Sequence, residues 1–213
     1  MQFADLALDA LILKAIAEQG YQSPTPIQQK TIPVILQGKD VLGGAQTGTG
    51  KTAAFTLPIL QKLISQPKTL EPKQIRCLVL TPTRELAQQV ADNIAAYARH
   101  LPLKTAVFYG GVSINPQLDA ADGGLDILIA TPGRLLDHLH QGTISLYQLE
   151  VLVLDEADRM LDMGFINDIK KVLALLPKKR QNLLFSATFS DDIRKLAKGL
   201  VNDPLEVSVS PAN

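Results

Sequence analysis

Residues 40 to 52 decide the fold, and they read Asp-Val-Leu-Gly-Gly-Ala-Gln-Thr-Gly-Thr-Gly-Lys-Thr. The first part, Asp40–Gly44, is a short apolar run of the kind found in buried β-strands, and Ala53–Ile64 further on is typical of a helix. Between the two lies a glycine-rich turn. The sequence therefore predicts a strand, a loop and a helix in direct succession.

This loop is close to the phosphate-binding pattern of a glycine, four residues and then Gly-Lys-Ser/Thr. Gly50-Lys51-Thr52 fits the end of the pattern, although Ala45 stands where the first glycine is usual. We expect the loop to cradle a nucleoside triphosphate, with Lys51 neutralising the β- and γ-phosphates and Thr52 ligating Mg²⁺. The loop residues are Ala45, Gln46, Thr47, Gly48, Thr49, Gly50, Lys51 and Thr52.

Similar apolar runs recur along the chain, with amphipathic stretches between them such as Arg84–Arg99 and Ile166–Leu176. Short Val/Ile/Leu-rich runs that alternate with helices predict an α/β fold with a mostly parallel central sheet and helices on both faces. The further predicted strands are Ile75–Thr81, Thr105–Tyr109, Asp126–Ala130, Val151–Leu154 and Leu183–Ser186.

The composition limits the classes of function. The 213 residues suit one domain, and the 21 basic and 21 acidic side chains cancel, so any contact with nucleic acid must be local. The single cysteine, Cys77, lies in an apolar run and is predicted to be a buried thiol. The sequence contains no apolar run long enough to span a membrane and no signal-peptide pattern at its start, so we expect a cytoplasmic location.

An acidic pair follows the apolar run Val151–Leu154. A phosphate-loop enzyme needs a carboxylate near Mg²⁺ at the end of a buried strand. We expect Asp155 to hold the metal and Glu156 to orient and deprotonate the attacking water. The alternative is a solvated helix start, because acidic residues are common in first helical turns.

Asp155-Glu156-Ala157-Asp158 spells the signature of the DEAD-box RNA helicases, and the chain resembles that family from about Phe3 to Val207. Within the family, its motif sequences most resemble those of the bacterial RhlE-type members. The resemblance implies a RecA-like phosphate-loop NTPase domain. Other family motifs appear in order, namely the Q motif at Gly20–Gln28, motif Ia at Pro82–Ala87, the glycine doublet Gly110-Gly111, motif Ib at Thr131–Arg134 and motif III at Ser186–Thr188.

The resemblance also implies which base is bound. Gln28 carries a donor and an acceptor on one amide, which complement the N6 and N7 edge of adenine. In the family this glutamine contacts adenine, so we expect ATP rather than GTP. Tyr21 and the upstream Phe3 are expected to pack at the same site, with ordinary core packing as the alternative for both.

The resemblance implies that RNA is bound through its sugar–phosphate backbone, without recognition of its base sequence. The alternative for Arg84 is a local pairing with Glu85 or Gln88. In the family Ser186 and Thr188 bond to the acidic motif, here through Asp158, and link ATP to strand separation. The residues expected on the RNA path are Pro82, Thr83, Arg84, Gly111, Thr131, Gly133 and Arg134.

We expect residues 1–207 to be the first RecA-like domain of a longer helicase, and 208–213 to be the start of a linker or a frayed end. The family's second RecA-like domain supplies arginines for hydrolysis and half of the RNA groove. The chain alone is thus expected to be a monomer that binds ATP weakly and hydrolyses it poorly. An ATP-gated RNA clamp without unwinding, and a GTPase, are the alternatives.

Overall fold

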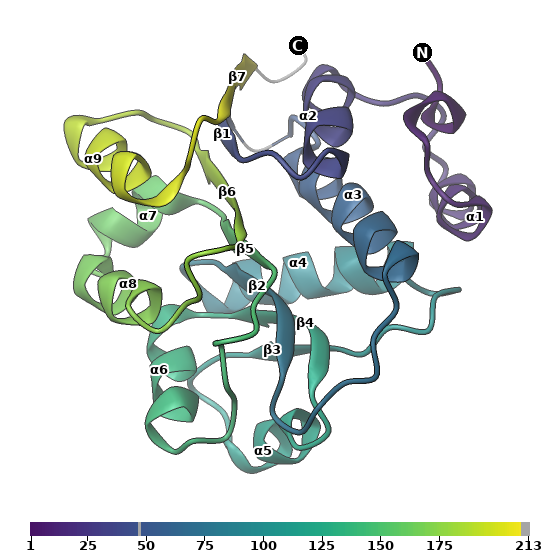
Figure 1. Ribbon diagram of the computed structural model, residues 1–213. Coiled ribbons are helices and arrows are strands. Elements are labelled where there is room, and N and C mark those ends of the chain that lie inside the picture. Colours follow the sequence, from purple (N-terminus) through teal and green to yellow (C-terminus); the bar gives the residue numbers. More distant parts are fainter. Residues whose placement is uncertain (47, 210–213) are drawn as a thin grey trace. The chain divides into compact units, whose positions relative to one another are not determined.

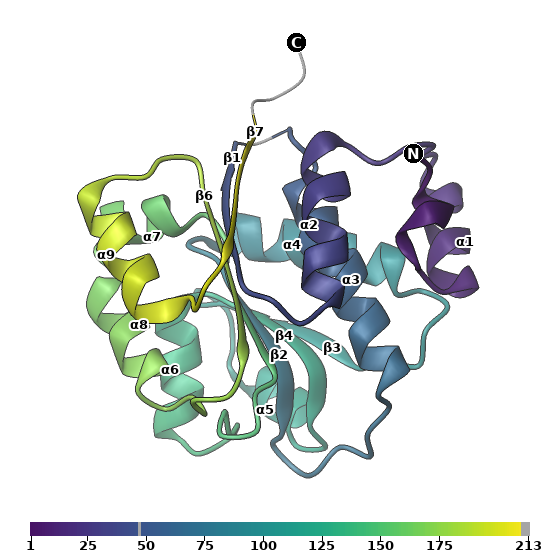
Figure 2. The ribbon, with the colours of Figure 1, turned by 45° about the horizontal axis from the view of Figure 1, so that its top comes forward.

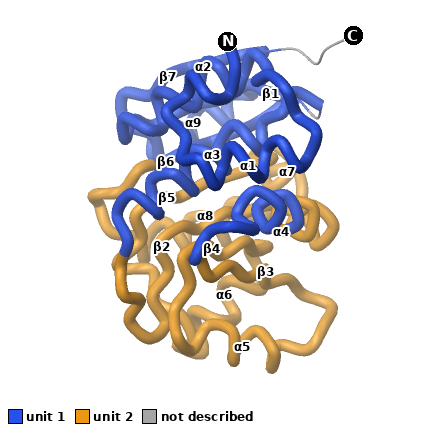
Figure 3. The backbone as a smooth tube through the Cα atoms, turned by 90° about the vertical axis from the view of Figure 1, so that its right-hand side faces the viewer, with its two compact units in different colours: residues 1–67, 92–102, 182–213 blue, residues 68–91, 103–181 orange. Residues whose placement is uncertain are grey.

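The computed structural model describes residues 1–46 and 48–209 (Figure 1), which divide into two compact units (Figure 3). Unit 1 comprises Met1–Pro67, Asp92–Pro102 and Asn182–Asn213, and unit 2 comprises Lys68–Ala91 and Leu103–Gln181. The strand pairs described within each unit are parallel.

Unit 1 is built on three strands in the order β6-β1-β7, and Val41 of the central strand lies opposite Leu183 on one side and Leu205 on the other. Helices α2 and α3 cover one face of these strands and α9 covers the other (Figure 2). The elements of unit 1 are η1 (Phe3–Leu6), α1 (Ala10–Glu18), α2 (Pro26–Leu36), β1 (Val41–Ala45), α3 (Lys51–Ser65), β6 (Gln181–Ser186), α9 (Asp191–Leu200) and β7 (Leu205–Val209).

Two consecutive glycines in β1 are explained by aromatic rings that lie against the strand. A Cβ atom on Gly43 would lie 2.6 Å from Cδ1 of Phe185, and one on Gly44 would lie 2.7 Å from Cε2 of Phe189. Glycine within a strand often marks such a close approach. Phe185 in turn packs against Phe55 of α3, with ring centroids 5.4 Å apart.

The buried carboxylate of Asp40 fixes the starts of the strands in unit 1. Its Oδ1 accepts from the backbone N–H of Asn182 at 2.8 Å, and its Oδ2 accepts from the N–H of Asn202 at 2.8 Å. The Asp40 carbonyl oxygen also accepts from the N–H of Leu205 at 2.9 Å. One residue before β1 thus bonds to the second residue of β6, to the first residue of β7 and to the turn before β7.

Unit 2 has four strands in the order β3-β4-β2-β5, and Cys77 of β2 lies between Ile127 and Val151. Helix α4 begins in this unit and ends in unit 1. The elements are β2 (Ile75–Leu80), α4 (Arg84–Tyr97), β3 (Thr105–Phe108), α5 (Asn115–Ala121), β4 (Leu125–Ala130), α6 (Pro132–His140), β5 (Val151–Leu154), α7 (Ala157–Asp162) and α8 (Ile166–Leu173).

A buried arginine lies inside β2, where the sequence would favour an apolar residue. The Arg76 side chain is 1% exposed, and its guanidinium lies 2.7 Å from Glu150 and 3.5 Å from Asp126. Lys68 adds a second cation 3.2 Å from Glu150. Burial alone would raise the pKa of Glu150, but the bonds to Arg76 and Lys68 outweigh it and hold that pKa below its ordinary value.

All six predicted strands are confirmed, with boundaries within two residues of those expected. Cys77 is fully buried, as predicted. Residues 208 and 209, which were expected to begin a linker or a frayed end, are the last two residues of β7 and pair with β1. β7 has only one buried residue, and its polar Glu206 and Ser208 interrupt the apolar run that would predict a strand. Within the described ranges, none of the helices is long and apolar enough to cross a bilayer.

Candidate functional site

The phosphate loop leads from β1 directly into α3, which starts at Lys51. Gly48 and Gly50 have φ angles of +90° and +84°, a left-handed backbone that glycine adopts without steric cost. The Thr49 hydroxyl donates to the carbonyl oxygen of Gln46 at 2.8 Å and holds the loop in a tight turn. Thr47 lies outside the described residues.

The loop and the start of α3 fit an anionic group. The first N–H groups of a helix point away from its N-terminus and carry a partial positive charge, and α3 is 15 residues long. Lys51 is its first residue and is largely buried, and Thr52 follows it half-buried. A cation, a hydroxyl and backbone N–H groups thus share one end of one helix, which is the donor set that a triphosphate with Mg²⁺ requires.

Gln28 is tied to this loop within unit 1. It is only 6% exposed, and its Nε2 donates to the carbonyl oxygen of Gly50 at 3.1 Å while its Oε1 accepts from the N–H of Thr25 at 3.0 Å. A Cβ atom on Gly50 would lie 2.6 Å from that Nε2 and 2.8 Å from the Thr25 hydroxyl. The glycine therefore allows the Q-motif amide to reach the phosphate loop.

The two aromatic residues predicted at the base differ in exposure. Tyr21 is 55% exposed, with its ring centroid 6.4 Å from that of Tyr97, so much of its ring is open to a flat ligand. Burial, together with the neighbouring Tyr21, raises the pKa of Tyr97 above its ordinary value. Phe3 is buried in η1, which packs against α2. The predicted contact of Phe3 with a nucleotide stays a prediction.

In unit 2 the acidic residues follow β5. Asp155 is 2% exposed, and its N–H donates to the carbonyl oxygen of Leu80 at 2.9 Å, so it continues the β2–β5 pairing. Glu156 has φ +59° and ψ +46°, a left-handed conformation that is uncommon for a residue with a side chain. Strained backbone of this kind is often kept at functional positions. Asp158 lies in the first turn of α7, and its Oδ1 accepts from the N–H of Arg159 at 3.1 Å.

Motif III lies in unit 1, at the end of β6. The Ser186 hydroxyl donates to the carbonyl oxygen of Thr188 at 2.7 Å, which closes a local turn. Phe189 then folds back over Gly44, and the guanidinium of Arg194 lies 5.5 Å from the centroid of the Phe189 ring. The predicted bonds from Ser186 and Thr188 to Asp158 stay a prediction.

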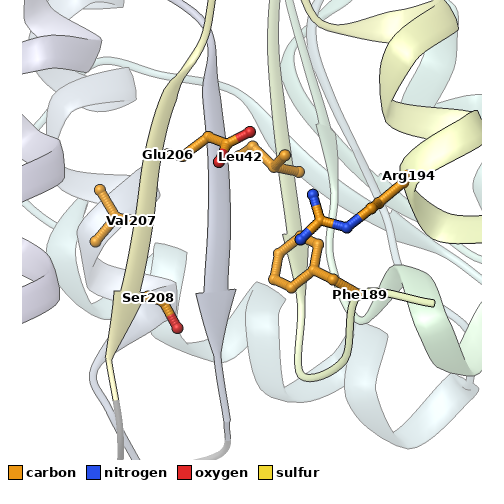
Figure 4. Close-up of a pocket in the computed structure, with 6 residues that line it drawn as sticks. All are labelled: Leu42, Phe189, Arg194, Glu206, Val207 and Ser208. Atoms are coloured by element: carbon orange, nitrogen blue, oxygen red, sulfur yellow. The ribbon is translucent and has the colours of Figure 1, made fainter. Parts of the chain in front are cut away.

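A pocket of about 290 Å³ opens beside this turn (Figure 4). Figure 4 shows Arg194 and Phe189 on one side of it and the side chains of Glu206 and Ser208 on β7. None of the predicted site residues lines it; its walls are Leu42, Phe189, Arg194, Glu206, Val207 and Ser208.

The structure brings two of the predicted RNA-path residues together in unit 2. Thr83 accepts from the N–H of Leu86 at 3.2 Å and caps α4, which places Arg84 at the helix start. The Arg84 guanidinium lies over the ring of Tyr109, 5.0 Å from its centroid, and its Nη1 lies 3.7 Å from where a Cβ of Gly111 would be. This contact with Tyr109 differs from the pairing with Glu85 or Gln88 that the sequence suggested as an alternative, and the RNA contact of Arg84 stays a prediction. Pro82, just before Thr83, is buried.

The remaining RNA-path residues lie at the start of α6. Thr131 precedes the helix, and its N–H donates to the carbonyl oxygen of Phe108 at 3.1 Å. Gly133 is exposed, and a Cβ there would meet no atom within 4 Å, so packing does not require a glycine. Arg134 has an 11% exposed side chain, and its Nη1 and Nη2 donate to Gln117 Oε1 and the Val112 carbonyl oxygen at 3.1 and 3.0 Å.

Sequence reasoning missed Tyr109 and Gln117. Tyr109 stands directly before the glycine doublet, and that position was the only signal in the sequence, because Arg84 comes near its ring only in the folded structure. Gln117 gave no local signal, because it lies alone in a short helix. Its significance comes only from its partners in space.

The sequence profile of the DEAD/DEAH box helicases matches residues 25–196. The chain belongs to this family. It is 46% identical over 211 residues to the DEAD-box ATP-dependent RNA helicase RhpA of Helicobacter pylori, covering 99% of this chain and 42% of that protein. It is 49% identical over 208 residues to the ATP-dependent RNA helicase DeaD of Escherichia coli, covering 97% and 32%. The chain thus spans less than half the length of either relative.

A solved DEAD box protein from Methanococcus jannaschii is 42% identical and superposes with a TM-score of 0.89, over 98% of this chain and 56% of that one. The predicted RecA-like α/β fold and the predicted family are thereby confirmed. The finer assignment to the RhlE-type members stays a prediction.

Proposed function

We propose that this chain is the ATP-binding part of a DEAD-box RNA helicase, which couples ATP binding and hydrolysis to RNA binding and local duplex unwinding. The observation that carries the proposal is the bond from Gln28 to Gly50, which joins a base-reading amide to a phosphate loop at a helix N-terminus. The names of the relatives, ATP-dependent RNA helicases, support it.

The chemistry divides among four side chains. Lys51 neutralises the β- and γ-phosphates, and Thr52 and Asp155 offer the hard oxygen ligands that Mg²⁺ prefers. Bound Mg²⁺ neutralises charge on the phosphate oxygens. Glu156 orients the attacking water and accepts its proton. The left-handed backbone of Glu156 supports this role, since such strain persists where a side chain must point in one direction.

Adenine is recognised by Gln28, with Tyr21 and Phe3 packing at the base. In the structure each polar atom of the Gln28 amide makes one bond, and a primary amide still has one more N–H and one more lone pair to offer. That remaining capacity matches the N6 and N7 edge of adenine. Guanine presents an acceptor in place of the N6 amino group, so GTP binds less tightly.

RNA binds through its sugar–phosphate backbone, without sequence reading. Its path follows the capped start of α4 and the start of α6, where backbone N–H groups suit phosphate oxygens. Ser186 and Thr188 transmit the state of the ATP site through Asp158. The residues assigned to the RNA path are Pro82, Thr83, Arg84, Gly111, Thr131, Gly133 and Arg134.

The whole protein also contains a second RecA-like domain that completes the RNA groove and supplies arginines to the transferring phosphoryl group. Such arginines contribute on the order of 10³–10⁵ in rate in related enzymes, so this chain alone hydrolyses ATP poorly. By itself it is a monomer. A cytoplasmic location fits the buried free thiol of Cys77.

The nucleotide part of the proposal is tested by displacing a fluorescent ADP analogue from the chain with ATP or GTP. We expect ATP to compete better than GTP, and Gln28→Ala to remove the preference while Lys51→Ala weakens both nucleotides. Gln37→Ala, at an exposed glutamine at the end of the same helix, is the control. Equal competition by GTP would show a GTPase or an unspecific site.

The helicase part is tested on the full-length protein with a labelled RNA duplex. We expect ATP-dependent strand separation that is lost in Glu156→Gln, together with RNA-stimulated ATP hydrolysis. An ATP-gated RNA clamp would instead hold RNA in an ATP-dependent manner and separate no strands. Steady RNA-stimulated hydrolysis by the 213-residue chain alone would show that no second domain is needed.

A further inference from the structure

Gln117 on α5 joins three segments of unit 2 that are separate in the sequence. Its Nε2 donates to the carbonyl oxygen of Tyr109 at 3.2 Å. Its Oε1 accepts from Arg134 Nη1 at 3.1 Å and lies 3.0 Å from Nε2 of His138. The side chain is 8% exposed, so these bonds are shielded from water. One amide therefore connects the glycine doublet, α5 and α6.

The partners fix the protonation of His138. The amide oxygen of Gln117 can only accept, so Nε2 of His138 must carry a proton and donate it. Nδ1 lies 2.8 Å from the Thr143 hydroxyl, whose one proton has two acceptors within reach, Nδ1 and the carbonyl oxygen of His138 at 3.1 Å. His138 is fully buried and stacks on Phe108, with ring centroids 4.4 Å apart. Burial and the nearby Arg134 lower the pKa of His138 below its ordinary value, which agrees with a neutral ring.

The loop of residues 109–112 contains Gly111, which is one of the residues expected to contact RNA. Arg134 Nη2 also donates to the carbonyl oxygen of Val112, so residues 109 to 112 are bonded at both ends. Within that loop Gly111 has a left-handed φ of +81°, and Gly110 would have no atom within 4 Å of an added Cβ. Two adjacent glycines make the backbone of this loop flexible. The Tyr109 side chain is held by Gln88 and Arg84, and Gln117 and Arg134 restrain the backbone carbonyls on both sides of the glycines.

We propose that Gln117 is a positioning residue for RNA binding, which holds the loop of residues 109–112 and the start of α6 in the arrangement that receives the sugar–phosphate backbone. The inference rests on the proposed RNA-binding function. Gln117 touches no RNA itself. It lowers the entropy that the loop loses on binding, because the loop is already ordered before RNA arrives. His138 and Thr143 hold the amide oxygen of Gln117 in place.

The first test measures the contact itself, by NMR titration of the imidazole signals of the chain. The chain has three histidines, and His138→Gln identifies the signal of interest. Gln117→Glu places a carboxylate opposite Nε2, which stabilises the imidazolium, so the titration midpoint of His138 should move to higher pH. A midpoint of His138 that stays the same in Gln117→Glu would overturn the inference, because the two side chains would then not be in contact.

The second test measures the consequence, by anisotropy of a labelled oligouridylate bound to the full-length protein with a non-hydrolysable ATP analogue. In Gln117→Ala we expect the Kd for RNA to rise about tenfold, the size that loss of one hydrogen bond to a charged group produces. The affinity for ATP should not change. Gln141→Ala, an exposed glutamine at the end of α6, is the matched control and should leave both affinities unchanged.

The salt dependence separates a loosened loop from a lost ionic contact. Each lost phosphate contact reduces the slope of log K against log salt by about 0.7 for single strands, whereas a loosened loop leaves the slope unchanged. An unchanged Kd in Gln117→Ala, or a reduced slope, would overturn the inference alone. Failure of the unsubstituted protein to bind RNA would overturn the proposed function as well.

Discussion

The left-handed backbone of Glu156 makes a prediction about stability that is independent of catalysis. An L-residue in this region costs roughly 1–2 kcal/mol, because Cβ crowds the following carbonyl oxygen. Glycine avoids that cost but loses about 0.5–1 kcal/mol more backbone entropy on folding. At φ +59° the two terms compete, so Glu156→Gly should be about 0.5–1 kcal/mol more stable than Glu156→Ala.

The comparison of alanine with glycine isolates the backbone. Both variants lack the carboxylate, so whatever that carboxylate contacts cancels between them. The control pair is Lys170→Ala and Lys170→Gly, at an exposed position inside α8. There glycine should be the less stable variant by about 1 kcal/mol. The entropy term is common to both positions, so the difference between the two comparisons measures the strain at Glu156.

The assay is urea unfolding followed by far-UV circular dichroism, since the chain has no tryptophan. The reasoning is refuted if glycine lowers the free energy of unfolding at position 156 as much as it does at position 170. If it holds, the strain is stored at a residue proposed to be catalytic. Glu156→Gly would then be more stable than Glu156→Ala, although neither variant would hydrolyse ATP in the full-length context.

Three further outcomes are expected from the packing and charge of the chain. Glu150→Gln should destabilise by about 2–4 kcal/mol above pH 5, because it leaves the buried Arg76 with one weaker partner. The pKa of Glu150 is lower in the folded chain than in the unfolded one, so this loss should shrink as urea unfolding is repeated at falling pH, and a loss independent of pH would contradict it. Gly44→Ala should destabilise by about 1–3 kcal/mol through contact with Phe189, and Phe189→Ala should be less harmful in the Gly44→Ala background than alone; additive effects in thermal unfolding would argue against the contact. Asp40→Ala should cost about 3 kcal/mol by leaving buried N–H groups without an acceptor, with Asp40→Asn about half as severe; equal effects of the two in urea unfolding would show that the bonds do not matter.

The sequence predicted most of the sheet because its strands are buried on both faces. A strand in that environment is a run of Val, Ile and Leu, and β2, β4 and β5 stand out for that reason. Strand β7 did not, since it is half exposed and carries Glu206 and Ser208. Its pairing with β1 depends on backbone bonds that any side chain permits. Arg76 lies inside the buried strand β2, although a charged residue there argues against a buried strand. Its burial is explained only by its partners Glu150 and Asp126, which the sequence does not place beside it.

The sequence identifies candidate site residues where the chemistry requires a fixed spacing along the chain. It does not identify residues that come into contact only in the folded structure. Lys51 and Thr52 must follow a glycine-rich loop, so their spacing along the chain identifies them. Arg84 stacks on Tyr109, which lies 25 positions further along the sequence, so no local pattern predicts this contact. Gln117 is the extreme case, because nothing around it in the sequence distinguishes it from a surface glutamine.

The bond from Gln28 to Gly50 changes how the nucleotide site should be understood. Taken from the sequence, Gln28 reads the base and the loop holds the phosphates, as two separate tasks. In the structure the same amide holds the loop, because Gly50 lacks a side chain that would push it away. If adenine bonds to the remaining N–H and lone pair of Gln28, we expect it to shift the amide and with it the bond to Gly50. Gly50 is the N-cap of α3, so such a shift would reach the helix end that is proposed to bind the phosphates. We therefore expect ATP and GTP to be distinguished at the proposed phosphate loop as well as at the base.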